Sequence, residues 1–195
     1  VPGVILAGGQ SRRMNRKDKS FLEIGERTLL DMTIERLSLQ SDKMAINTNS
    51  YSSKYKRYGL PIIHDHMEGY LGPLAGILTS MKWAKDKGYE KVITVAVDTP
   101  LFPLNLVNEL YQKMEVSNSD IVFAASSADR KQKKILHPVF GLWKTYLCDD
   151  LRKELEGGIR KVTLWSAKQK TSSVCFADDL IAVSYTHLRA HETRS

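Results

Sequence analysis

The sequence has few cysteines and no long apolar run. Its two cysteines, Cys148 and Cys175, belong to no C-x-x-C pair. A zinc site or a disulfide framework is therefore not indicated, and buried free thiols are the favoured interpretation. No apolar run approaches the roughly 18 residues of a membrane span, and no basic segment near Val1 leads into a longer apolar stretch. These absences favour a cytoplasmic protein without membrane contact.

The composition is typical of a folded globular protein, with 42% hydrophobic and 26% charged residues. A length of 195 residues predicts one domain with a single core. We expect this domain to span residues 1–183. Residues 184–195 resemble a vector- or adapter-derived read-through more than a native ending, so we expect a non-native tail there.

The net charge of +7 is concentrated in two short stretches. Residues 12–19 contribute five basic residues and one acidic residue, and residues 129–134 contribute four and one. A protein that coats nucleic acid usually spreads its basic residues along a face, whereas compact clusters suit small polyanions such as nucleotide phosphates. The pattern favours a small phosphate ligand over nucleic acid.

Short apolar runs alternate with helical patterns along the chain. Strands are predicted at 4–7, 44–46, 61–63, 91–97 and 121–125, and helices at 29–39, 74–83 and 104–114. This alternation predicts a three-layer α/β fold with a mainly parallel sheet. The less regular remainder is predicted to be extended at 137–143 and 172–176 and helical at 146–155.

Ligands of such sheets bind at the carboxyl ends of the strands. Gly8, Asn47, Asp65 and Asp98 each come shortly after a predicted strand. We therefore expect these four residues along one edge of the sheet.

The loop after the first strand combines glycines with basic residues. Gly8 and Gly9 allow the backbone to approach a phosphate closely, and Arg12, Arg13 and Lys19 neutralise charge. Neither the Walker motif nor the G-x-G-x-x-G motif is present. On the glycines alone, a solvated basic loop is an equally good interpretation.

Several spaced motifs together resemble one family. They are Leu6-Ala7-Gly8-Gly9-x-Ser11-x-Arg13-Met14, Asp18-Lys19, Asn47, the Asp65 loop, Gly72-Pro73-Leu74-Ala75-Gly76, Asp98-Thr99-Pro100 and, more weakly, His137-Pro138 and Gly157-Gly158-Ile159-Arg160-Lys161. In this order they resemble the molybdenum cofactor guanylyltransferases over roughly residues 3–165. The resemblance implies a Rossmann-like nucleotidyltransferase fold and transfer of GMP from GTP to the terminal phosphate of molybdopterin, with release of pyrophosphate.

The resemblance also implies roles for individual residues. GTP would contact Leu6, Ala7, Gly8, Gly9, Arg13, Lys19, Asn47, Asp65 and Asp98. Arg13 and Lys19 would balance phosphate charge, and Asp98 would hold Mg²⁺, the implied cofactor, so these three would be catalytic. His137, Arg160 and Lys161 would contact molybdopterin. Transient contact with other proteins of molybdenum cofactor biosynthesis is a further expectation.

The residue types by themselves leave alternatives open. Asp98 suits Mg²⁺, which prefers one or two protein oxygens together with phosphate and water, but it could instead cap the helix beyond Pro100. Asn47 and Asp65 could read guanine edges or could be turn residues. His137 could be a packed histidine at a strand start.

The remaining polar clusters also have two interpretations. His64 and His66 would share one side of an extended segment, but no third metal ligand is evident, so loop histidines without metal are favoured. Arg160 and Lys161 could grip an anion or could be the solvated face of the next helix. Because of its charge, we hypothesise that the basic segment 130–134 helps hold molybdopterin.

The chain departs from the family pattern at two places. Asn15 stands where glycine usually follows the methionine, and asparagine tolerates positive φ, so the turn can survive. The asparagine-rich segment that leads into the family's last helix has no match after Cys175-Phe176-Ala177-Asp178. This puts the C-terminal contacts to the second substrate in question.

Other functions share some of these features. A molybdopterin cytidylyltransferase or an isoprenoid or sugar-phosphate nucleotidyltransferase would use the same chemistry, although the cytidine branch tends to carry Ala-Gly where this chain has Gly8-Gly9. Outside the enzymes, a nucleotide-binding or nucleic-acid-binding module is the alternative. The compact charge clusters and the absence of an aromatic-rich basic face count against nucleic acid.

Overall fold

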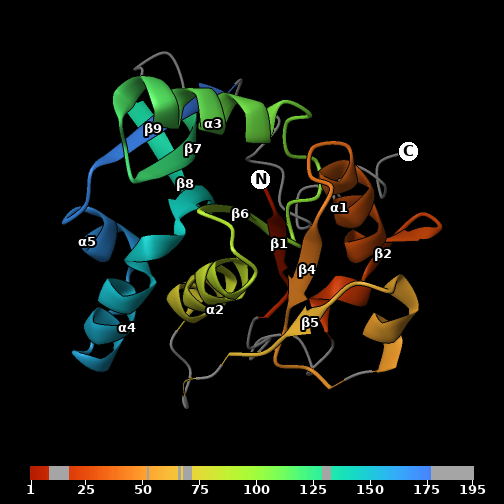
Figure 1. The fold of residues 1–195 in the computed structure, drawn as a ribbon. Coiled ribbons are helices and arrows are strands. Elements are labelled where there is room, and N and C mark those ends of the chain that lie inside the picture. Colours follow the sequence, from red (N-terminus) through yellow and green to blue (C-terminus); the bar gives the residue numbers. More distant parts are fainter. Residues whose placement is uncertain (9–17, 52, 66, 68–71, 129–132, 177–195) are drawn as a thin grey trace.

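The computed structural model describes residues 1–8, 18–51, 53–65, 67, 72–128 and 133–176 (Figure 1). Within these residues a seven-stranded sheet has the order β5-β4-β1-β6-β8-β7-β9. Its strands are β1 (Gly3–Leu6), β4 (Met44–Asn47), β5 (Ile62–Ile63), β6 (Lys91–Ala96), β7 (Ile121–Ala128), β8 (Lys133–Lys144) and β9 (Thr171–Phe176). Only β8 runs antiparallel to its neighbours in this sheet. The predicted α/β fold with a mainly parallel sheet is confirmed.

The helices and the smaller elements connect these strands. The α-helices are α1 (Leu29–Ser38), α2 (Pro73–Asp86), α3 (Leu106–Ser117), α4 (Cys148–Glu156) and α5 (Val162–Ser166). Three short 3-10 helices are η1 (Lys19–Phe21), η2 (Ser53–Tyr58) and η3 (Thr145–Leu147), and a small hairpin pairs β2 (Glu23–Ile24) with β3 (Arg27–Thr28). None of the helices in the described part of the chain is long and apolar enough to cross a membrane.

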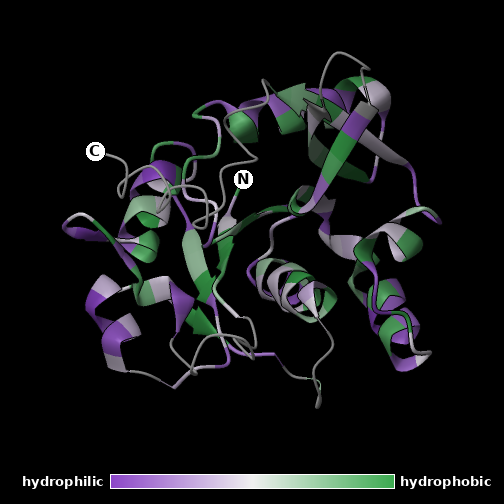
Figure 2. Ribbon diagram, turned by 180° about the vertical axis from the view of Figure 1, so that it is seen from behind, coloured by the Kyte–Doolittle hydropathy of each residue, from purple (hydrophilic) through white to green (hydrophobic). Residues whose placement is uncertain are grey.

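Alternating side chains of the strands build two cores, one on each face of the sheet, where the chain length predicted a single one. On β1, Ile5 points into a core with α1 and α3, whereas Val4 and Leu6 point into a core with α2, α4 and α5. The sheet is thus covered on both faces, which is the predicted three-layer arrangement (Figure 1). Figure 2 shows the matching hydropathy pattern, with hydrophobic strands at the centre and helices that carry both hydrophobic and hydrophilic residues. Burial on both faces explains why these strands read as short continuous apolar runs.

Both cysteines are free thiols, as predicted, but only Cys148 is buried. The prediction of burial is wrong for Cys175, which is exposed on β9. This strand is at the edge of the sheet, so it has a neighbouring strand on one side only within the described residues.

Candidate active site at the carboxyl edge of the sheet

The carboxyl ends of β1, β4, β5 and β6 form one edge of the sheet. The register pairs Leu6 with both Asn47 and Ala96, and it pairs Asn47 with Ile63. The residues that follow these positions therefore emerge side by side. Gly8, Asn47, Asp65 and Asp98 lie along this edge, as the sequence predicts.

Gly8 follows the end of β1 at this edge. Ala7 N donates to the carbonyl of Asn47 at 2.8 Å, and Val97 N donates to the carbonyl of Leu6 at 3.2 Å, so the strand end is fixed on both sides. Gly8 itself is exposed, and no described residue accepts a hydrogen bond from its N–H. This N–H is available to a phosphate oxygen. Gly9 and Arg13, which also carry predicted roles, lie outside the described residues.

Asn47 and Asp65 are joined by a hydrogen-bond network. Nδ2 of Asn47 donates to the Ile63 carbonyl at 3.2 Å and to Oδ1 of Asp65 at 2.9 Å. Thr79 Oγ1 donates to the same carboxylate oxygen at 3.1 Å, and Asn49 Nδ2 donates to Oδ2 at 2.9 Å. Both carboxylate oxygens of Asp65 are thus occupied within the protein, whereas no described residue donates to Oδ1 of Asn47.

Gly76 allows α2 to pass close to Asn47. A Cβ atom on Gly76 would lie 2.6 Å from Oδ1 of Asn47 and 3.3 Å from a methyl carbon of Leu6. Such a contact to Asn47 is shorter than real Cβ atoms show, so only glycine fits here without displacing the amide. The helix thereby forms one wall beside the amide.

Asp98 differs from Asp65 in its hydrogen bonding. Asp98 lies in the turn after β6 and is partly buried, and its one hydrogen bond within the described residues comes from the Thr99 hydroxyl to Oδ1 at 3.3 Å. No described residue donates to its other oxygen. A partly exposed carboxylate of this kind is the donor that Mg²⁺ requires, because this ion takes few protein oxygens and fills its other positions with phosphate and water. The residue present therefore fits the implied metal.

Lys19 lies in a short turn that is closed by Asp18. Asp18 is the N-cap of η1, and its Oδ1 accepts a hydrogen bond from Ser20 N at 3.1 Å. The Lys19 side chain is exposed and has no hydrogen bond or ion pair to any residue that the structure describes. Its ammonium group is available to a ligand.

The three residues predicted to contact molybdopterin are differently placed. His137 lies on β8, where it pairs with Ala124 in the middle of β7, its Nε2 is 2.8 Å from the Ser126 hydroxyl, and burial lowers the pKa of its imidazole below the ordinary value. The Arg160 guanidinium donates to the carbonyls of Leu155 and Ile159 at 2.6 and 2.8 Å, so it caps the end of α4. Lys161 is exposed before α5.

The other basic and metal-like features are only partly described. Residues 129–132 of the basic segment lie outside the described residues, and Lys134 is exposed. His64 Nδ1 is hydrogen-bonded to the Thr48 carbonyl, and His66 lies outside the described residues. Among the described residues no group of three or more His, Cys, Asp or Glu side chains could hold a metal ion.

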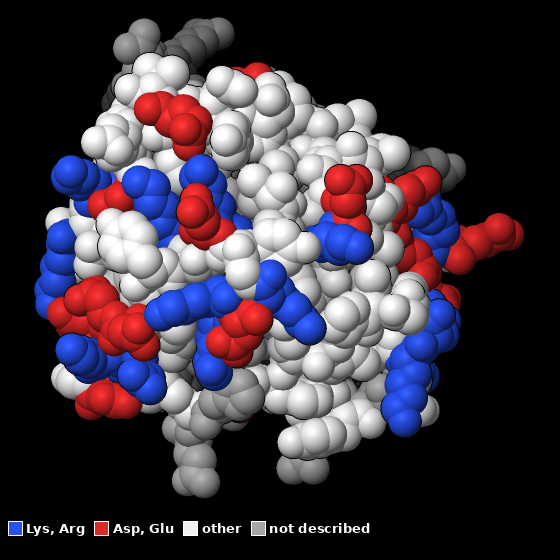
Figure 3. Space-filling view, viewed as in Figure 1, with Lys and Arg blue, Asp and Glu red and all other residues white. Residues whose placement is uncertain are grey.

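A cavity lies beside this edge, between α2 and α4. It has a volume of about 220 Å³ and borders Asp65 and Thr79. Its charged lining consists of three acidic and three basic residues, among which Lys85 pairs with Asp149 at 2.9 Å. Figure 3 shows acidic and basic side chains intermixed over this region. The balanced charge makes this cavity a poor site for a triphosphate.

Sequence reasoning missed the residues that support Asp65 and Lys19. Asn49 and Thr79 hold the Asp65 carboxylate, and Tyr55 contacts the Lys19 turn. These are common polar residues, and each acts on a partner that is distant in sequence. For Gly76 a signal exists, because a glycine inside a helical pattern indicates close packing.

The fold is shared with solved structures of low sequence identity. A molybdopterin-guanine dinucleotide biosynthesis protein A from Archaeoglobus fulgidus superposes with a TM-score of 0.70 at 18% identity, covering 100% of this chain and 88% of that one. A 4-diphosphocytidyl-2C-methyl-D-erythritol synthase from Anaerococcus prevotii gives 0.73 at 13% identity, covering 99% and 96%. These likenesses define the class of fold, which is the three-layer nucleotidyltransferase fold.

The sequence comparisons are more specific. Residues 3–171 match the MobA-like NTP transferase domain. Molybdenum cofactor guanylyltransferases from a Bradyrhizobium species and from Shewanella putrefaciens are 38% and 35% identical, over 89% and 91% of this chain and 81% and 87% of their own length. The chain belongs to the MobA-like NTP transferase family and is a nucleotidyltransferase. The resemblance inferred from the motifs is confirmed.

Proposed function

We propose that the protein transfers GMP from GTP to the terminal phosphate of molybdopterin and releases pyrophosphate. The observation that carries this proposal is the identity of 34–40% to proteins named molybdenum cofactor guanylyltransferase, over most of the chain. The free donors and the uncommitted carboxylate at the sheet edge support the same chemistry. Because it uses GTP, we expect the reaction to take place in the cytoplasm.

The terminal phosphate of molybdopterin attacks the α-phosphorus of GTP, and the bond from that phosphorus to the β-phosphate oxygen breaks. The nucleophile is already ionised, so no covalent enzyme intermediate is required. Catalysis then depends on positioning and on neutralising charge in the transition state. In this proposal the N–H groups of Gly8 and Gly9 bind phosphate oxygens, and Arg13 and Lys19 offset charge around the α-phosphate and the leaving pyrophosphate.

The carboxylate of Asp98 would hold Mg²⁺. When bound there, the ion would supply positive charge that offsets the negative charge of the phosphates. The reason to prefer Asp98 over Asp65 is the hydrogen bonding, because both oxygens of Asp65 accept bonds from protein side chains. Asp65 instead orients Asn47.

Guanine would be recognised beside Asn47. The Nδ2 group of Asn47 is committed to Ile63 and Asp65, which fixes the amide and leaves Oδ1 as an acceptor. Guanine presents N–H donors along one edge, and a fixed amide oxygen can accept from them. Leu6 and Ala7 would supply the apolar surface next to this position.

Molybdopterin would bind at the remaining end of the edge. His137 pairs with Ala124 of β7, and the Arg160 carbonyl lies 3.9 Å from the position of a Cβ on Gly72, next to the start of α2. We place the anionic pterin between these elements, with Lys161 and the segment 130–134 supplying positive charge. We also propose transient contact with other proteins of the same biosynthesis.

Product analysis tests this function directly. Purified protein is incubated with molybdopterin, Mg²⁺ and either GTP, CTP or ATP, and pyrophosphate and dinucleotide are quantified. We expect the guanine dinucleotide and pyrophosphate in equal amounts from GTP, and little product from the other nucleotides. A cytosine dinucleotide as the main product would move the assignment to a cytidylyltransferase, and no product with any nucleotide would contradict transferase activity on molybdopterin.

A further inference from the structure

Tyr55 is a buried tyrosine whose hydroxyl reaches the turn that carries Lys19. Its exposed fraction is 0%, and it lies in η2, more than thirty residues after that turn. The hydroxyl donates to Oδ2 of Asp18 at 2.7 Å and lies 2.9 Å from the Ser20 hydroxyl. The two neighbours of Lys19 in the sequence are thus bonded to the same phenol oxygen.

The two oxygens of the Asp18 carboxylate accept hydrogen bonds from different residues. Oδ1 accepts from Ser20 N and closes the turn, while Oδ2 accepts from Tyr55. Asp18 and Ser20 flank Lys19, and the bond between them fixes the backbone from which the exposed Lys19 side chain extends. Tyr55 fixes both of them.

The same hydroxyl connects the turn to the sheet edge. Thr48 Oγ1 lies 3.5 Å from the Tyr55 oxygen, and Thr48 directly follows Asn47 at the end of β4. Burial raises the pKa of the Tyr55 hydroxyl above its ordinary value, so the group stays protonated and remains a donor to Asp18. A neutral donor to a carboxylate makes a stronger hydrogen bond than one between two neutral groups.

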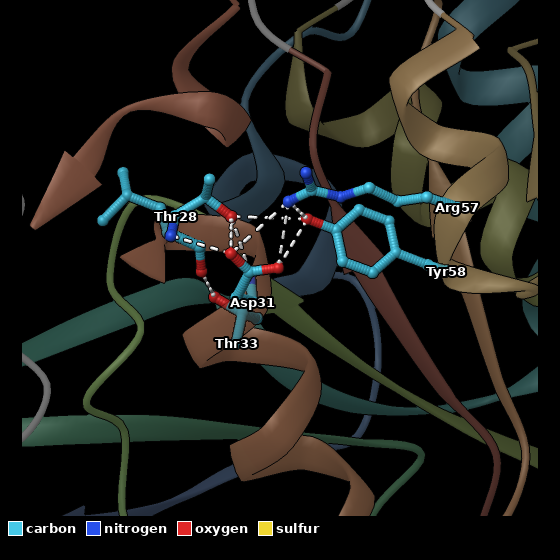
Figure 4. A network of polar contacts seen from close by, with 6 residues as sticks. Thr28, Asp31, Thr33, Arg57 and Tyr58 are labelled. Atoms are coloured by element: carbon cyan, nitrogen blue, oxygen red, sulfur yellow. Dashed lines mark hydrogen bonds and ion pairs between the residues drawn. The ribbon is translucent and has the colours of Figure 1, made fainter. Parts of the chain in front are cut away.

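Two further residues anchor η2 itself. Tyr58 OH donates to Oδ1 of Asp31 at 2.7 Å, and the Arg57 guanidinium donates to the same oxygen at 3.2 Å (Figure 4). These bonds attach the end of η2 to the start of α1 without contacting Asp18. The chain thus offers a second tyrosine in the same element as a matched control.

We propose that Tyr55 is a positioning residue for Lys19 in the transfer reaction. Its hydroxyl holds the Asp18–Ser20 turn at a fixed position relative to the end of β4. The Lys19 ammonium group can then contact the phosphates of the nucleotide. This proposal rests on the proposed function, because it assigns Tyr55 an effect only through Lys19. If Tyr55 served only in packing, its ring would be needed but its hydroxyl would not. The centroid of this ring lies 4.8 Å from that of the Phe21 ring.

The first test compares Tyr55→Phe with Tyr58→Phe, since each removes one hydroxyl from η2. We expect Tyr55→Phe to lower kcat for GMP transfer about tenfold, which corresponds to about 1.4 kcal/mol. We expect Tyr58→Phe to leave kcat unchanged. Asp18→Asn retains an oxygen for the cap but weakens the bond to Tyr55, so it should also lower kcat. Equal losses in both tyrosine variants, or none in either, would overturn the proposal.

The second test uses Lys19→Ala as the background. If Tyr55 acts through Lys19, Tyr55→Phe should change kcat less than about twofold once Lys19 is absent, because the two effects are then not additive. A tenfold further loss in the double variant would show a role that is independent of Lys19 and would overturn the proposal.

Hydrogen exchange of the Ser20 amide tests the positioning of the turn without an activity assay. This amide donates to Asp18, so we expect it to exchange faster in Tyr55→Phe than in the unmodified protein and to be unchanged in Tyr58→Phe. An unchanged rate in Tyr55→Phe would contradict the proposal. If the unmodified protein transfers no GMP, the proposed function fails; if Lys19→Ala lowers kcat and Tyr55→Phe does not, only the positioning role fails.

Discussion

Asp65 and Asp98 both follow strands of the parallel sheet, yet their carboxylates are not equivalent. Asp65 accepts hydrogen bonds from three side chains, whereas Asp98 accepts only a 3.3 Å bond from its neighbour Thr99 among the described residues. An occupied carboxylate orients its donors, and an uncommitted one can bind a cation. The sequence predicted the positions of both residues. It could not distinguish their environments, because the donors Asn49 and Thr79 come from other elements.

Replacement of Lys19 tests its charge role at the residue scale. Lys19→Ala should lower kcat about 10²-fold or more, because a preorganised cation beside the transferred phosphate is lost. Steady-state GMP transfer at saturating GTP and molybdopterin measures the effect. Lys87→Ala, at an exposed lysine after α2, should leave kcat unchanged. An unchanged kcat in Lys19→Ala would refute the assignment.

Gly76→Ala tests the recognition of the base. The new methyl would lie 2.6 Å from Oδ1 of Asn47, so the amide must move and its bond to Asp65 is disturbed. We expect the Kd for GTP to rise about tenfold, the equivalent of one hydrogen bond to the base. Titration calorimetry measures the Kd. The control is Gly157→Ala, where the added Cβ would meet carbonyl oxygens no closer than 3.4 Å. An unaltered Kd in Gly76→Ala would exclude Asn47 as the base contact.

At the scale of elements, the start of α1 shows how local and distant residues combine. Thr28 and Asp31 form a capping box, in which Asp31 N donates to Thr28 Oγ1 at 3.0 Å and Thr28 N donates to Oδ2 of Asp31 at 2.8 Å. Arg57 and Tyr58 complete the network from η2 (Figure 4). The start of this helix at residue 29 was predicted from the sequence, but the two partners in η2 were not, since no local pattern links them to α1.

This network predicts a specific loss of stability in acid. Partial burial alone would raise the pKa of Asp31, but hydrogen bonds from Thr28 and Tyr58 and the charge of Arg57 outweigh burial and lower the pKa from 3.8 to about 2. The carboxylate therefore stabilises the fold above pH 3.8, and this contribution is lost as the pH falls toward 2. Solvent screening at this partly exposed site limits the contribution to about 1 kcal/mol.

Urea unfolding of Asp31→Asn at pH 7 and pH 2.5 measures this contribution. We expect the variant to be less stable by about 1 kcal/mol at pH 7 and to differ little from the unmodified protein at pH 2.5. Asp42→Asn changes an exposed aspartate that has no ion pair to any described residue, and it should have no effect at either pH. A constant difference for Asp31→Asn at both pH values would contradict the pKa assignment.

Most helices and strands could be predicted because each has a buried apolar pattern, periodic in the helices and continuous in the strands. The helix predicted at 29–39 is observed as Leu29–Ser38, and the strand predicted at 91–97 is Lys91–Ala96. The extended segment at 137–143 is confirmed, but it belongs to the longer strand β8, which runs antiparallel. Its direction could not be predicted, because strand polarity depends on pairing with β6 and β7 and not on local periodicity. The β2–β3 hairpin was missed because its strands, Glu23–Ile24 and Arg27–Thr28, contain no apolar run.

At the scale of the whole molecule, the parallel strands explain why residues far apart in sequence share a site. The order β5-β4-β1-β6 brings the loops after these strands to one edge, and the two cores on opposite faces hold the strands in place. In the proposed function this edge supplies a backbone donor at Gly8, an amide acceptor at Asn47 and a carboxylate at Asp98. This combination is what transfer of a nucleotide requires.

Calorimetric titration of nucleotides tests the central claim most directly. GTP, CTP and ATP are each titrated into the protein with and without Mg²⁺, and the series is repeated with Asp98→Ala and with the control Asp42→Ala. The account predicts that GTP binds most tightly, that Mg²⁺ strengthens this binding, and that only Asp98→Ala abolishes the effect of Mg²⁺. Equal binding of the three nucleotides, or a Mg²⁺ effect that survives in Asp98→Ala, would contradict it.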